Sequence, residues 1–236
     1  MKIKITIVGT VLIVSWILCQ MFSGGNSLEE NFSLVYGWME FGNVQSMLVT
    51  FTRWFLPQII LCLFFGNYIE EEVMIVLPYI LTRTKKLWHF TGKVYLKLIF
   101  STFGMALLFA IVPFIIGMTE GKQAFHWEKG WDKVFLWCVY QVMCVVLLNC
   151  ISIFIKTIHG LWGLICLEGI FWGIYRTIDV KIIPESVGKY IPIYGLRFFD
   201  GRKILSPDNT GILIFGVVTA AGIIGSTKSL VKRDIL

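Results

Sequence analysis

The chain has 236 residues and a formal net charge of +6; 56% of its residues are hydrophobic and only 15% are charged. Soluble domains are about 45–50% apolar and about 25% charged, so this composition excludes an ordinary soluble enzyme and predicts an integral membrane protein. Cytoplasmic loops rich in Lys and Arg, facing anionic lipid, account for the positive charge, and we expect no nucleic-acid partner.

Six apolar runs are long enough to cross a bilayer, because a transmembrane helix needs about 20 mostly apolar residues. The first run lacks the cleavage site of a signal peptide, so we interpret it as an uncleaved span. The sequence therefore predicts an all-α polytopic membrane protein, with residues 1–236 forming one transmembrane domain. In chain order the predicted spans are residues 5–23, 47–69, 98–118, 134–155, 157–175 and 210–227.

The distribution of charge predicts the orientation of these spans. Six spans place both termini on one side, and the positive-inside rule selects the cytoplasm. The connection 24–46 contains Glu29, Glu30 and Glu40 but no Lys or Arg, as expected of an outer loop. Residues 70–97 then form the one sizeable cytoplasmic connection, and no loop is long enough to bury a soluble core.

That connection has the pattern of a short amphipathic helix. Its acidic residues, Glu70–Glu72, suit the first turn of a new helix better than the end of the second span. Apolar residues and Pro78 follow, and a basic cluster then leads into the third span. Such a helix can lie on anionic headgroups or fit a groove on a soluble partner.

The pattern resembles the membrane subunit of an ATP-binding cassette transporter of the type-2 export class, and within that class it is similar to the peptide or lantibiotic exporters and the self-immunity permeases. The matching features are six spans with both termini inside, Glu71–Glu72 after the second span, the run 81–86, Gly92–Lys93 and the basic tail 228–234. The chain lacks the G-x-x-x-x-G-K-[ST] loop that holds nucleotide phosphates.

The resemblance implies a permease that moves a peptide, antibiotic or lipid-like substrate out of a bacterial cell, and no enzymatic activity in this chain. It implies no cofactor bound here, with ATP and Mg on a separate ATP-binding subunit, and a second permease copy that is identical or paralogous. The segment after the second span would be the coupling helix. Its ATPase-contacting residues would be Glu71, Glu72, Tyr79, Thr82, Arg83, Lys85 and Lys86.

Two charged residues lie inside predicted spans. Glu168, in the fifth, either lines a substrate path or dimer seam or ties helices together, since a carboxylate at this depth faces protein or water. Arg53, in the second, is either its counter-charge or reaches the outer interface. Gly169 and Gly173 permit close helix packing, within one subunit or between two.

Other polar residues suggest less. Gln141 and Asn149 in the fourth span are predicted to hydrogen-bond between helices. The six cysteines lie in apolar runs without a C-x-x-C pair, and we interpret them as buried apolar residues. An intramembrane enzyme would need clustered Glu and His on facing helices, whereas only Glu168 is deeply placed. A non-catalytic membrane accessory or assembly protein is the other alternative.

Overall fold

The computed structural model describes residues 2–22, 27, 28, 32, 35, 36, 44–73, 87–122, 127–179, 184–192, 199, 200, 203, 204 and 210–233. Most of these residues form helices, which turns connect, and one antiparallel pair of two-residue strands is present. A further short helix covers residues 68–73. The elements are α1 (Lys2–Phe22), α3 (Val44–Phe65), α5 (Leu87–Thr119), α6 (Trp127–Ser152), α7 (Thr157–Asp179), α8 (Glu185–Gly188), β1 (Phe199–Asp200), β2 (Lys203–Ile204) and α9 (Thr210–Arg233).

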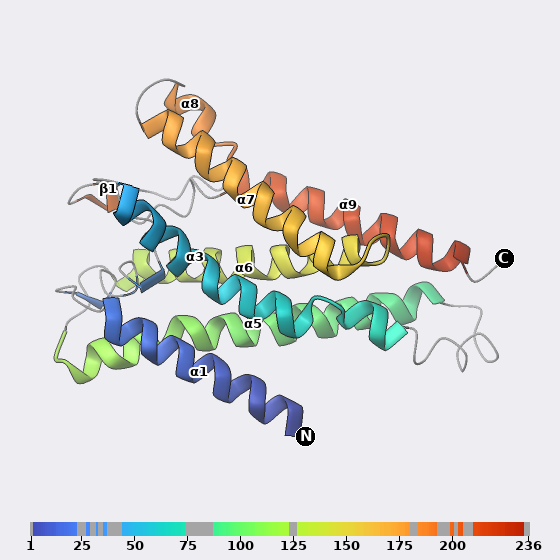
Figure 1. Cartoon of the computed structure of the whole chain (residues 1–236), viewed down its shortest axis with the longest axis horizontal. Coiled ribbons are helices and arrows are strands. Elements are labelled where there is room, and N and C mark those ends of the chain that lie inside the picture. Colours follow the sequence, from blue (N-terminus) through green and yellow to red (C-terminus); the bar gives the residue numbers. More distant parts are fainter. Residues whose placement is uncertain are drawn as a thin grey trace.

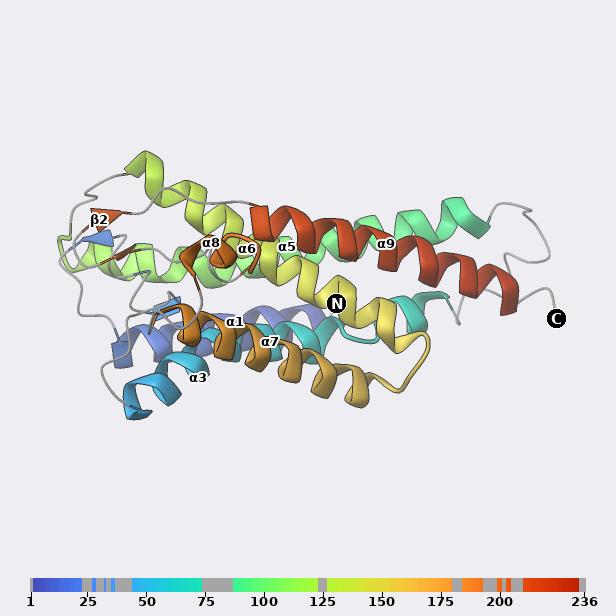
Figure 2. The same cartoon turned by 90° about the horizontal axis from the view of Figure 1, so that it is seen from above.

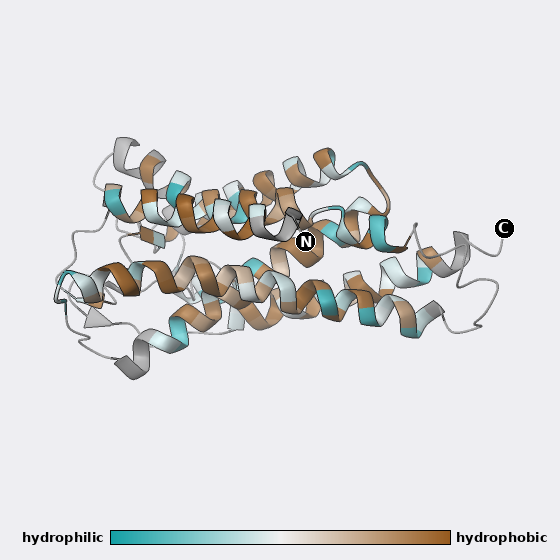
Figure 3. Cartoon of the chain, turned by 90° about the horizontal axis from the view of Figure 1, so that it is seen from below, coloured by the Kyte–Doolittle hydropathy of each residue, from teal (hydrophilic) through white to brown (hydrophobic). Residues whose placement is uncertain are grey.

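The described helices include four that are long and apolar enough to cross a membrane. They overlap the last four predicted spans, and α1 adds a shorter apolar stretch, Thr6–Met21. Figure 3 shows apolar residues along the lengths of the helices. The chain is therefore a helical membrane protein, while six crossings and their orientation stay a prediction. The four stretches are Trp88–Thr119, Trp131–Ser152, Thr157–Ile174 and Thr210–Leu230.

The long helices run along one axis in alternating directions (Figures 1 and 2). The N-terminal ends of α1 and α5, the turn between α6 and α7, and the C-terminal end of α9 lie toward the same end of the bundle. Helix α6 lies at its centre and packs against α3, α5, α7 and α9. Of the apolar stretch of α6, 67% is buried inside the bundle, compared with 22% of the apolar stretch of α7. A helix that is apolar around its whole circumference, as α6 is, suits such a central position.

The helix ends differ from the predicted span ends. Helix α5 begins at Leu87 rather than at residue 98. Its first turns contain exposed lysines such as Lys93 and Lys97, so they lie outside the apolar run although they are helical. Helix α3 begins at Val44 and ends at Phe65 rather than spanning 47–69. Hydropathy locates the apolar part of a helix, whereas the helix itself ends where its backbone hydrogen bonds end.

Part of the connection between α1 and α3 packs inside the bundle. Phe32 and Tyr36 are fully buried, and the Tyr36 ring stacks on Trp137 of α6 with centroids 5.2 Å apart. The hydroxyls of Tyr36 and Ser15 share a hydrogen bond of 2.5 Å, and Ser15 Oγ also donates to Phe109 O at 3.2 Å. This segment therefore joins α1, α5 and α6.

Candidate functional site

Two of the polar clusters inside the bundle include residues predicted from the sequence: the end of α3 and the surroundings of Glu168. Of the predicted coupling residues, the exposed Glu71 and half-buried Glu72 lie on the short helix 68–73. The others, Tyr79, Thr82, Arg83, Lys85 and Lys86, lie outside the described residues.

Helix α3 is interrupted at Gly66 and Asn67. Gly66 N–H donates to Cys62 O at 2.7 Å, and the short helix starts with Glu71 N–H donating to Asn67 O at 3.0 Å. A Cβ at Gly66 would clash with the Cys62 carbonyl oxygen and lie 3.0 Å from Leu148 Cδ2. Glycine therefore permits close contact here, and the acidic residues occupy a separate helix. We call residues 65–73 the α3 junction.

The side chain of Asn149 on α6 holds the α3 junction. Asn149 Oδ1 accepts a hydrogen bond from Ile69 N–H at 3.0 Å. Its Nδ2 donates to Phe65 O at 2.6 Å and to Val145 O at 2.9 Å. Asn149 is fully buried, so its amide provides hydrogen-bond partners to backbone groups of α3 that water does not reach.

Side chains from α7 and α5 also contact the α3 junction. Thr157 Oγ1, at the start of α7, donates to Asn67 Oδ1. Lys97 Nζ on α5 donates to Glu72 Oε1 at 2.9 Å and lies 5.5 Å from the centre of the Tyr68 ring. The hydrogen bond from Lys97 lowers the pKa of Glu72 below its ordinary value. The α3 junction is thus bonded to α5, α6 and α7, the short helix itself to α5 and α6.

The second cluster surrounds Glu168, in the middle of α7 and 1% exposed. Its Oε1 accepts hydrogen bonds from Gln58 Nε2 at 3.1 Å, from Tyr140 OH, and from Cys144 Sγ at 3.7 Å. These uncharged partners belong to α3 and α6, so the carboxyl group joins three helices within one subunit.

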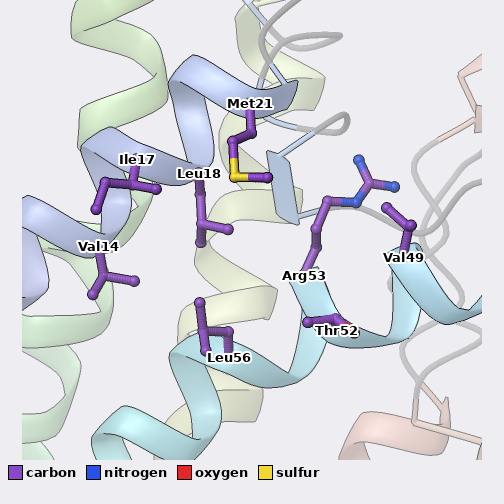
Figure 4. A pocket seen from close by; sticks show the side chains of 8 residues that line it. All are labelled: Val14, Ile17, Leu18, Met21, Val49, Thr52, Arg53 and Leu56. Atoms are coloured by element: carbon purple, nitrogen blue, oxygen red, sulfur yellow. The ribbon is translucent and has the colours of Figure 1, made fainter.

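The neighbouring predicted residues face elsewhere. Gly169 and Gly173 are exposed, and a Cβ at either would have nothing within 4 Å. Arg53 is 4% exposed and lines a pocket of about 480 Å³ between α1 and α3. Figure 4 shows its guanidinium group at one end of this pocket, near Val49. Arg53 and Glu168 therefore lie in different surroundings.

Sequence reasoning located Glu168 but missed its partners. Gln58 and Tyr140 carry no local signal, because their role depends on helices distant in the chain. Asn149 does bond to a neighbouring helix. The equally buried amide of Gln141 has no hydrogen-bond partner within the part of the chain that the structure describes.

The side chains around Glu168 and at the α3 junction supply contacts between helices. Among the described residues, no group of three or more His, Cys, Asp or Glu side chains could hold a metal ion. No protein-family model, curated protein or solved structure matches this chain. The inference of function therefore depends on the geometry of the helices and their contacts.

Proposed function

We propose that this chain is the permease subunit of an ATP-binding cassette exporter of the type-2 class. It would cross the cell membrane six times with both termini in the cytoplasm and move a peptide, antibiotic or lipid-like substrate outward. ATP and Mg would bind to a separate ATP-binding subunit. A second, identical or paralogous permease would complete the transporter.

The observation that supports this proposal is the α3 junction. It places a short acidic helix toward the end of the bundle where α5 begins and α9 ends (Figure 1). In the proposed orientation this end faces the cytoplasm, where an ATP-binding subunit would dock. The acidic helix and the basic run 81–86 would form the docking surface together.

The contacts of the α3 junction suit the transmission of movement. A displacement of the short helix acts directly on α5 through Lys97 and on α6 through Asn149, and the preceding residue Asn67 contacts Thr157 of α7. Such polar contacts between apolar helices define specific packing arrangements. Closure of the ATP-binding subunits would then shift several helices together between two arrangements.

Affinity purification of the chain from its native membrane tests the proposal. We expect a P-loop ATPase to co-purify, and Arg83→Glu to weaken the complex because it reverses a charge on the docking surface. Lys189→Glu makes the same reversal just after α8, toward the opposite end of the bundle, and serves as the control.

Full ATPase binding by Arg83→Glu would refute the coupling assignment. Purification without any ATPase, from membranes in which the protein is active, would leave an accessory or assembly protein as the better description.

A further inference from the structure

The α3 junction contains an exchange of hydrogen-bond partners. In an uninterrupted α-helix, Ile69 N–H would donate to the carbonyl oxygen four residues earlier, Phe65 O. Here both groups bond instead to the Asn149 carboxamide, at 3.0 Å and 2.6 Å. One side-chain amide from α6 therefore takes the place of one backbone hydrogen bond of α3.

This insertion accounts for the position of the break. Sharp helix kinks arise at proline, at glycine or serine pairs, at π-bulges, or where a side chain enters the hydrogen-bond ladder. Pro57 lies within α3, whereas the interruption comes later, at Gly66 and Asn67. Asn149 enters at that place, and the neighbouring Leu148 packs where Gly66 leaves room.

The α3 junction has a second arrangement that satisfies the same backbone groups. If the Asn149 side chain withdraws, Phe65 O and Ile69 N–H can bond to each other, as in an ordinary helix. The Asn149 amide keeps an acceptor within α6, because Nδ2 already donates to Val145 O at 2.9 Å. In both arrangements the buried N–H of Ile69 and the carbonyl of Phe65 have hydrogen-bond partners. A segment that changes between two conformations inside a membrane needs this, because lipid offers no partner to the backbone.

We propose that Asn149 is a positioning residue that holds α3 open. With its amide inserted, the acidic helix 68–73 is separate; with the amide withdrawn, α3 continues through residue 73 as one helix. The consequence for transport rests on the proposed function: the contact between α3 and α6 sets the direction of the surface offered to the ATPase. Movement of α6 relative to α3 would then be the step that couples the bundle to that surface.

Spin labels on α3 and on the short helix measure this change. Val49 and Glu71 are both exposed and replaceable by labelled cysteine, with Cys166→Ser removing the exposed native thiol. A continuous helix rises 1.5 Å per residue and would separate these Cα atoms by about 33 Å. We expect Asn149→Ala to shift the distance distribution in detergent toward that value.

Gln141→Ala is the matched control, because it removes another fully buried amide of α6 that has no partner in the described part of the chain. It should leave the distance as in the wild type. If Asn149→Ala does not give a monodisperse protein, Asn149→Ser is measured in the same way, since one hydroxyl is too short to bridge both backbone groups. A distance equal to that of the Gln141→Ala protein would overturn the proposal.

The measurement needs no ATPase, so it is separate from the test of transport. A lengthened distance in a protein that binds no ATPase would refute the exporter and leave the role of Asn149 standing. Normal ATPase binding with an unchanged distance would refute the role of Asn149 and leave the exporter standing.

Discussion

At the scale of single residues, the environment of Glu168 explains how an apolar helix accommodates a carboxyl group. A carboxylate at the bilayer centre costs about 3 kcal/mol to insert. Three donors converge on Oε1. The group therefore serves as an acceptor for α3 and α6, a role that does not require a negative charge.

Substitution of Glu168 tests this role. Glu168→Gln keeps the shape and one acceptor oxygen, so we expect the free energy of unfolding to fall by less than about 1 kcal/mol. Glu168→Leu leaves the donors of Tyr140 and Gln58 buried and unpaired, at a cost of about 3 kcal/mol. Unfolding in detergent compares the two proteins, and equal stability would contradict the role.

Gly66 provides a second test at the residue scale. A Cβ there would meet Cys62 O, Leu148 and Thr157, so Gly66→Ala should destabilise the protein by about 1–3 kcal/mol through overpacking. Gly163 lies on α7 with nothing within 4 Å of its would-be Cβ. Gly163→Ala should therefore stabilise its helix by up to about 1 kcal/mol. Thermal unfolding separates these opposite signs, and a shift in the same direction for both would refute the packing argument.

At the scale of elements, the apolar runs predict α5, α6, α7 and α9 because hydropathy reports directly on burial in lipid. They do not predict the end of α3, since the predicted span continues past Phe65 to Ile69. The cause of that end is Asn149, which is distant in the sequence. Likewise, a carboxyl group within the fifth apolar run singles out Glu168 from the sequence alone. Its hydrogen-bond partners cannot be predicted in this way, because they depend on how three helices pack.

The attachment of the short helix to α5 should depend on pH. Lys97 lowers the pKa of Glu72, so the pairing stabilises the folded protein above the unfolded-state pKa of the carboxyl group and is lost as pH falls through the lower folded-state value. Because both side chains are partly exposed, the contribution is below about 1 kcal/mol.

Glu72→Gln should therefore lower the melting temperature slightly at pH 7, and its difference from the wild type should disappear in acid. Glu71→Gln removes the same charge from the neighbouring exposed position and is the control. A difference that persists unchanged at low pH would contradict the pairing.

At the scale of the whole molecule, α6 holds the bundle together. It contacts α3, α5, α7 and α9, and it supplies Tyr140, Cys144 and Asn149 to the two polar clusters. Movement of α6 would therefore change both clusters at once.

Single cysteines at opposite ends test the proposed orientation. In a Cys166→Ser background, Glu71→Cys should react with a membrane-impermeant thiol reagent only from the cytoplasmic side. Glu120→Cys, at the exposed turn after α5, should react only from outside. The unmodified background, whose other cysteines are buried, is the control. Reaction of both positions from the same side would exclude this topology.

The break in α3 also has a consequence for biosynthesis, because the residue that causes it is made much later than the helix it interrupts. While the ribosome has yet to deliver α6, Phe65 and Ile69 lack the Asn149 amide, and lipid provides no substitute. The nascent third of the protein should thus enter the bilayer with α3 extended through this point. The final bend is then introduced afterwards, when α6 arrives and takes its place among the earlier helices.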